Sequence, residues 1–117
     1  MLAIVTRALV WAAATTVAPA GPPPWPESLA CAAHVQAWAE LAKDANGGMP
    51  EDQSFDAAIF WSMAAMEAAR RDKVESPAVA EAAQKTERTR VKPLLAAKDP
   101  AAGAVLADCV KQVPPIK

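Results

Sequence analysis

Few side chains in this 117-residue chain could do chemistry. It has two cysteines, Cys31 and Cys109, and a single histidine, His34. Cys31-x-x-His34 has half the spacing of a haem-attachment motif, but the second cysteine of that motif is missing. As a metal pair it offers only two ligands, where zinc sites need three or four. No glycine-rich run has a phosphate-binding pattern. The sequence therefore predicts no catalytic residues, no metal site and no cofactor, and we expect a protein that is not an enzyme.

The carboxylates Asp56 and Glu67 belong to the predicted helix 54–71. They are eleven residues apart, or about three helical turns, which is too far for a carboxylate pair to act on one atom. Glu67 and His34 nevertheless remain candidate polar groups for a pocket between helices. Large apolar side chains would line that pocket: Trp38, Trp61 and Met63. Such a pocket would make the chain a ligand carrier or an enzyme, which is the main alternative to protein binding.

The two cysteines allow only one intramolecular pairing. Both fall on the apolar stripe of a predicted helix, Cys31 one turn into the first and Cys109 one turn before the end of the fourth. These two helix ends meet at the same end of an up-down-up-down bundle, so we expect a Cys31–Cys109 disulfide. A crosslink across 78 residues would stabilise the fold by roughly 4 kcal/mol. In a reducing compartment, two buried thiols are the alternative.

Four helices and no strands are predicted, with clear boundaries between them. Their expected ranges are about 27–45, 54–71, 77–97 and 100–113. Asn46-Gly47-Gly48 should end the first helix, and Asp52 or Ser54 should cap the second. Ser76-Pro77 and Asp99-Pro100 each place an N-cap side chain before a proline, and so open the third and fourth. Pro93 should kink the third helix or end it early. The predicted fold class is an all-α, small four-helix up-down bundle closed by one disulfide.

The predicted helix 54–71 is apolar on nearly every side. We expect it to be the central helix of the bundle, or a helix whose spare face meets a partner. The candidate interface residues are Phe60, Trp61, Met63 and Met66. Tryptophan and methionine suit a binding surface, but they fill cores just as readily, so a core role is the alternative.

The first 20 residues have the pattern of a secretory signal peptide. Arg7 is followed by the apolar run 8–18, and Ala18-Pro19-Ala20 supplies a small-x-small cleavage site with the cut near Ala20. The run is too short for a permanent membrane anchor. The expected organisation is a signal peptide at 1–20, a Pro-rich linker at 21–26, a helical bundle domain at 27–113 and a tail at 114–117. The mature protein should be periplasmic or secreted.

The net charge of −1, or −2 without Arg7, gives no electrostatic case for nucleic acid. A local basic patch at 85–92 has no aromatic residue. Glu81 and Glu87 are spaced to pair with its cations, so a solvated, ion-paired face is the preferred interpretation. The expected partner is another protein or a second copy of the chain, with no nucleic acid and no permanent membrane anchor.

These expectations describe a small exported helical protein that acts by binding. In outline it is similar to small helical periplasmic proteins with one disulfide, such as acid-stress chaperones and the immunity proteins that neutralise delivered toxins. The likeness is one of architecture, with no shared motif. A periplasmic stress chaperone would bind many clients, whereas an inhibitor would present a folded face to one partner.

Overall fold

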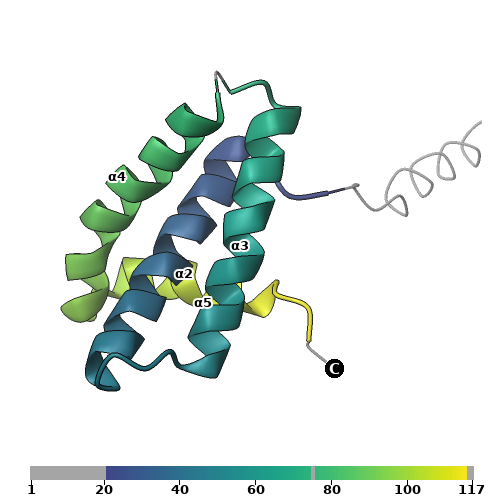
Figure 1. Ribbon diagram of the computed structural model, residues 1–117. Coiled ribbons are helices and arrows are strands. Elements are labelled where there is room, and N and C mark those ends of the chain that lie inside the picture. The colour runs from purple at the N-terminus through teal and green to yellow at the C-terminus, as the bar shows by residue number, and fades with distance from the viewer. Residues whose placement is uncertain (1–20, 75, 116–117) are drawn as a thin grey trace, which may run out of the picture.

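The computed structural model describes residues 21–74 and 76–115 (Figure 1). It contains four helices: α2 (Trp25–Ala45), α3 (Asp52–Arg71), α4 (Pro77–Ala96) and α5 (Pro100–Lys111). Helices α2, α3 and α4 run in alternating directions, and α5 crosses behind α2 (Figure 1). The all-α bundle closed by a disulfide is confirmed. The expected signal peptide, residues 1–20, lies outside the described residues, as do the last two residues of the tail.

The predicted N-caps of the last two helices are present. The Ser76 hydroxyl accepts a hydrogen bond from the Val79 N–H at 3.2 Å, and the Asp99 carboxylate accepts one from the Ala102 N–H at 2.9 Å. A proline follows each cap at the first helical position, where its missing N–H costs nothing. These two local signals therefore place the starts of α4 and α5.

The predicted cap of α3 is wrong, because Glu51 is the N-cap in place of Asp52 or Ser54. The Glu51 carboxylate accepts hydrogen bonds from the Ser54 N–H at 2.9 Å and the Gln53 N–H at 3.2 Å. These bonds, led by the one from Ser54, lower the pKa of Glu51. Ser54 is itself buried inside the helix and donates its hydroxyl to the Glu51 carbonyl. Glutamate is long enough to reach back and cap the helix, so Ser54 is left free to pack.

Two other boundaries differ slightly from expectation. Helix α2 begins at Trp25, two residues before the predicted start, and α4 continues through Pro93 to Ala96. Pro93 lies in the last turn of α4, where a single lost backbone hydrogen bond is not enough to end the helix earlier. Gly47 and Gly48, with φ of 64° and 89°, follow α2 as the sequence predicts.

The central helix is α2, so the expectation that the helix at 54–71 is central is wrong. Helix α2 packs against each of the other three helices and lies between α3 and α4 (Figure 1). It can do so because its buried side chains are mostly small: Ser28, Cys31, Ala32, Ala33, His34, Val35 and Ala37. Small side chains allow the neighbouring helices to approach closely on several sides.

The Cys31–Cys109 disulfide is confirmed, with the two Cα atoms 5.4 Å apart. It joins the first half of α2 to the last turn of α5 and belongs to the main core cluster. No described helix is long and apolar enough to cross a membrane. The disulfide is compatible with an exported protein.

Candidate functional site

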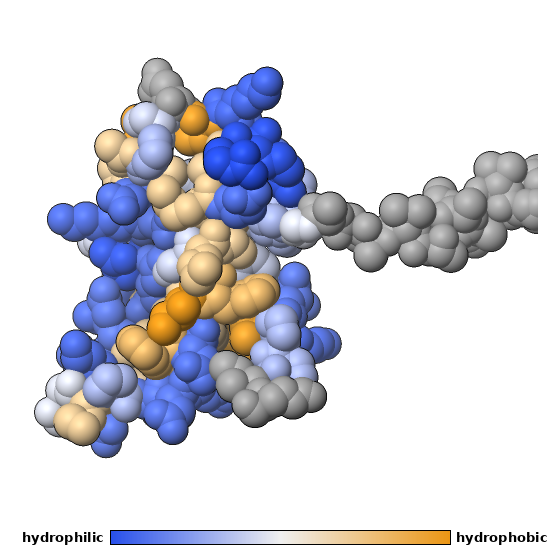
Figure 2. Space-filling view, turned by 45° about the vertical axis from the view of Figure 1, so that its right-hand side comes forward, coloured by the Kyte–Doolittle hydropathy of each residue, from blue (hydrophilic) through white to orange (hydrophobic). Residues whose placement is uncertain are grey.

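Three large apolar side chains lie exposed in a row on the outer face of α3. Phe55 is 48% exposed, Ile59 44% and Met63 68%. Their spacing of four residues sets them along one side of the helix, and we call them the α3 stripe. Figure 2 shows this face as an orange and tan band among blue side chains. Single exposed apolar residues are ordinary, but a contiguous group marks a possible contact surface.

The stripe is exposed because α3 turns its small side chains inward. Ala57, Ala65 and Ala68 are fully buried or nearly so, and they allow α2 to approach closely. The only large side chain on the inward face that is fully buried is Trp61. The larger aliphatic and thioether groups of α3 therefore have no covering element among the described residues.

A hollow of about 650 Å³ lies beside the stripe. Four of the predicted site residues line it: Phe60, Trp61, Met63 and Glu67. The remaining wall comes from Ala64, from Gln112 after α5 and from the N-terminal segment Gly21–Pro23. We call this the α3 hollow. The structure thus gathers most of the residues singled out in the sequence, although it does so at the side of α3 and not between helices.

Trp61 belongs to the core and not to the surface. It is 1% exposed, and its indole N–H donates a hydrogen bond to the Cys109 carbonyl at 2.9 Å. That carbonyl lies in the last turn of α5, where it also accepts the Gln112 N–H at 3.2 Å. Phe60 packs edge-on against Trp61, with ring centroids 5.4 Å apart and an interplanar angle of 87°. Trp61 is therefore buried, as the core alternative expects, while Phe60 is half-buried between core and surface.

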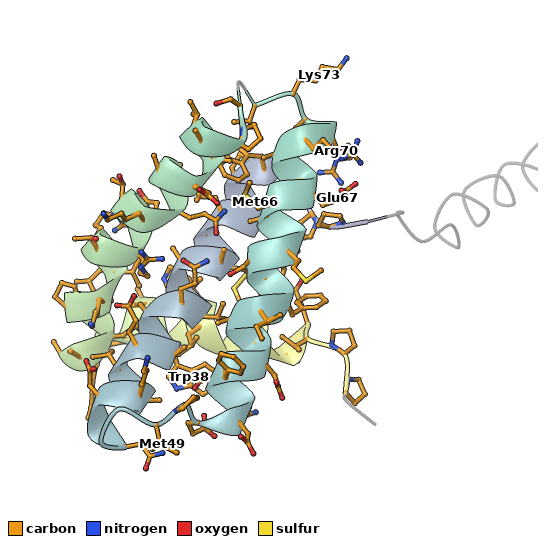
Figure 3. The ribbon with its side chains drawn as sticks, in the orientation of Figure 1. Trp38, Met49, Met66, Glu67, Arg70 and Lys73 are labelled. Atoms are coloured by element: carbon orange, nitrogen blue, oxygen red, sulfur yellow. A yellow bond between two sulfur atoms is a disulfide. The ribbon has the colours of Figure 1, made fainter. Side chains whose placement is uncertain are left out.

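Met63 and Met66 lie on different edges of α3. Met63 points to the open side, whereas the Met66 sulfur accepts a hydrogen bond from the Gln84 amide of α4 at 3.2 Å. Figure 3 shows Met66 on the edge nearest α4, and Glu67 and Arg70 projecting from the other edge. Met66 is therefore part of the contact between α3 and α4.

The two candidate polar groups do not meet. Glu67 is exposed and forms an ion pair with Arg70, whose hydrogen bond lowers the pKa of the Glu67 carboxyl. His34 lies on α2 and is 7% exposed. Its Nδ1–H donates to the Ala30 carbonyl one turn earlier, at 2.7 Å. Trp38 lines a different hollow, of about 660 Å³, between α2, α4 and α5.

The N-terminal segment that walls the α3 hollow is held by the end of α3. The Arg71 guanidinium donates to the carbonyls of Pro22 and Pro23, and the Asp72 carboxylate accepts the Trp25 N–H at 2.8 Å. The hydrogen bond from Arg71 and then that from Trp25 lower the pKa of Asp72. Part of the expected linker at 21–26 thus packs against the bundle, and its last two residues open α2.

A polar seam between α2, α3 and α4 was missed by sequence reasoning. The Gln36 amide donates to Ser62 at 2.9 Å and to the Gln84 side-chain oxygen at 2.8 Å, while its own oxygen accepts from Arg88. Helical spacing sets Gln36 opposite the apolar stripe that carries Cys31, so periodicity alone favours an exposed position. Only the position of α4 shows that Gln36 is partly buried and hydrogen-bonded.

The basic patch at 85–92 is ion-paired, although mostly with other partners than expected. Arg88 and Lys92 pair with Glu40 of α2 at 3.0 and 3.1 Å, whereas Arg90 pairs with Glu87 of its own helix. This face of α4 therefore helps to hold α2 and is not a free cationic surface.

No protein-family model, no curated protein and no solved structure matches the chain. Within residues 21–74 and 76–115, no three histidine, cysteine or acidic side chains gather as metal ligands.

Proposed function

We propose that the chain is a small, non-enzymatic helical binding protein that contacts another polypeptide through the α3 stripe and the α3 hollow. The observation that carries the proposal is the exposed row of Phe55, Ile59 and Met63 on a helix whose opposite face packs against α2. Side chains spaced by three or four residues are the usual anchors of a helix that recognises a groove or a second helix. Phenylalanine and methionine bring large contact areas, and methionine adapts its shape.

Binding is favoured over catalysis because both candidate polar groups, His34 and Glu67, already bond to residues of their own helices. The Nδ1 atom of His34 is engaged by its own helix, and Glu67 is engaged by Arg70. A general acid or base must reach the proton that it transfers, and it needs a pKa near the working pH. The lowered pKa of Glu67 keeps it ionised at neutral pH, so it serves as a charged rim beside apolar surface.

A specific contact is favoured over a chaperone role by the rigidity of the site. The stripe lies on a helix whose opposite face packs against α2, and α5 is held over Trp61 by the disulfide. A stress chaperone would gain apolar surface on mild unfolding, whereas the stripe is already exposed in the folded chain.

The proposed location is the periplasm or the outside of the cell, reached by cleavage of residues 1–20 near Ala20. The disulfide supports this location, since such bonds persist in oxidising compartments. Sequencing the amino terminus of the exported protein tests it. A first residue close to Gly21 is expected, and a retained Met1 in the mature protein would contradict it.

Site-directed photocrosslinking in the producing cell tests the binding function. A photoreactive phenylalanine at Met63 should give a discrete adduct, because that side chain is the most exposed of the stripe. The matched control is the same group at Thr89, which is exposed on α4 away from the stripe. An adduct at Met63 without one at Thr89 supports the proposal. Equal adducts at both positions, or none at either, would contradict it.

A further inference from the structure

We infer that the partner of the α3 stripe is a second copy of this chain, bound with the two α3 helices antiparallel across a twofold axis. The inference rests on the proposed function, since it takes the stripe to be the contact surface, and it names the occupant. Three features support it: the charges at the two ends of the stripe, the symmetry of the pairing and the open space around the stripe.

Opposite charges stand at the two ends of the stripe. Asp52 is exposed in the first turn of α3, and Arg70 is exposed in its last turn. They are 18 positions apart in the sequence, which is about five full turns, so both lie on the same side of the helix as Ile59. Among the described residues Asp52 forms no ion pair, and the Arg70 side chain is 72% exposed although it touches Glu67.

Antiparallel pairing places these charges opposite one another. With the twofold axis at residue 61, Ile59 of one copy faces Met63 of the other, and Asp52 faces Arg70. In the same register Phe55 faces Glu67, which pairs with Arg70 of its own chain. Each end of the contact then gains one ion pair, and the apolar side chains lie between the two. A parallel pairing would set Asp52 against Asp52 and Arg70 against Arg70, and like charges facing each other disfavour it. The charge pattern therefore selects a second copy in the antiparallel orientation.

The space around the stripe can admit a helix. On one edge is α4, which Met66 contacts through Gln84. On the other edge are the two terminal segments, Gly21–Pro23 near Glu67 and Val113–Pro115 near Asp52. Figure 2 shows the apolar band uncovered between its neighbours. The side chains of a facing α3 can therefore contact the stripe along its length.

The contact should be weak. Its apolar part comes mainly from three side chains that are each about half exposed, which is less than the roughly 800 Å² per partner of a standard interface. We expect a dimer that forms and dissociates reversibly in the micromolar range.

Analytical ultracentrifugation of the purified protein with its disulfide intact tests the dimer. A reversible monomer–dimer equilibrium is expected, and Ile59→Glu should raise the dissociation constant at least about tenfold, because it buries a charge at the centre of the contact. Thr89→Glu on α4 is the control and should leave the constant unchanged. Circular dichroism shows whether each variant keeps its helices. A monomer at all concentrations up to millimolar, or a dimer indifferent to Ile59→Glu, would overturn the inference.

Charge exchange tests the orientation without touching the apolar side chains. Asp52→Lys and Arg70→Glu should each weaken the dimer by about three- to tenfold. The reason is that each substitution places like charges opposite one another at both ends of the symmetric contact. The double variant should restore the affinity, because the two charges are then exchanged. Failure of the double variant to recover would overturn the antiparallel pairing.

Crosslinking at Met63 separates this inference from the proposed function. An adduct of twice the mass of the chain supports the second copy. An adduct with a different polypeptide, together with a monomer in the ultracentrifuge, overturns self-association and leaves the binding function intact. The absence of any adduct would contradict the proposed binding function itself.

Discussion

The two faces of α3 differ in the size of their apolar side chains: the buried face carries small ones and the exposed face carries large ones. The inward face is built mostly from alanine, whereas the outward face carries Phe55, Ile59 and Met63. The apolar residues of both faces recur at helical spacing, so the sequence pattern alone does not show which face is buried. Which face is buried depends on how closely α2 can approach, and small side chains permit the closest approach. Alanine therefore forms the core here, and the larger groups remain available for binding.

The inward face also contains the one large side chain that locks the helices together. Trp61 lies between α2, α3 and α5, and its indole N–H bonds to a carbonyl at the end of α5. No comparable constraint is seen for Met63, which is only two residues further along the same helix. The two positions provide the sharpest comparison between core and surface in this chain.

Trp61→Ala should have the largest effect on stability. Removing a fully buried tryptophan should lower the free energy of unfolding by about 3 to 5 kcal/mol, since it leaves a cavity. Met63→Ala should change it by less than about 0.5 kcal/mol. Urea denaturation followed by circular dichroism measures both. Similar losses at the two positions would show that α3 is packed on both faces.

Removing the disulfide should have the next largest effect. Cys31→Ala combined with Cys109→Ala should lower the free energy of unfolding by about 2 to 5 kcal/mol, because the bond closes a long loop. The loss of stability should be detectable at the inward face of α3 as faster hydrogen exchange at the indole N–H of Trp61. Reduced wild-type protein is the control and should behave in the same way. A variant as stable as the oxidised wild type would contradict this account.

Enlarging an inward alanine should destabilise by a smaller amount. Ala65 is fully buried, so Ala65→Leu should cost about 1 to 3 kcal/mol through overpacking. Ala82→Leu, on the exposed side of α4, is the matched control and should be nearly neutral. A stabilising Ala65→Leu substitution would contradict the close packing of α2 against α3.

Acidification should weaken the link between α3 and the N-terminal segment. We expect its effect on the free energy of unfolding to be the smallest of the four changes considered. The folded pKa of Asp72 lies below its ordinary value of 3.8, so its contribution is present above that pH and is lost as the pH falls through the folded pKa. The stability difference between wild type and Asp72→Asn should therefore narrow on acidification. Denaturation at neutral and at acid pH measures this difference. Asp56→Asn, on α3 far from the segment, is the control, and a difference independent of pH would contradict the role of Asp72.

Local features of the fold could be predicted because their causes are local. Ser76 and Asp99 cap helices through bonds to residues three positions away, and Gly47 and Gly48 adopt the positive φ that a helix end requires. The disulfide was also predictable, since two cysteines allow only one pairing, although α5 crosses α2 and does not run antiparallel beside it (Figure 1).

The candidate site was only partly predictable. Phe60 and Met63 were identified because α3 has more apolar residues than one buried face needs, and Glu67 as a polar group for a pocket. These three side chains do line one hollow. Trp61 could not be separated from them by pattern, since an aromatic residue suits both core and surface. His34 and Trp38 were grouped with them because the position of α2 relative to α3 was unknown.

The sequence by itself determined the helices, their ends and the cysteine pair, because these depend on neighbouring residues and on chain topology. Only the tertiary structure decided that α2 is central, that Gln36 is partly buried beside α4 and that Phe55, Ile59 and Met63 face outward. The physical reason is that helical periodicity defines faces but not their partners. Which face is covered depends on how closely the helices can pack, and here the alanine faces pack most closely.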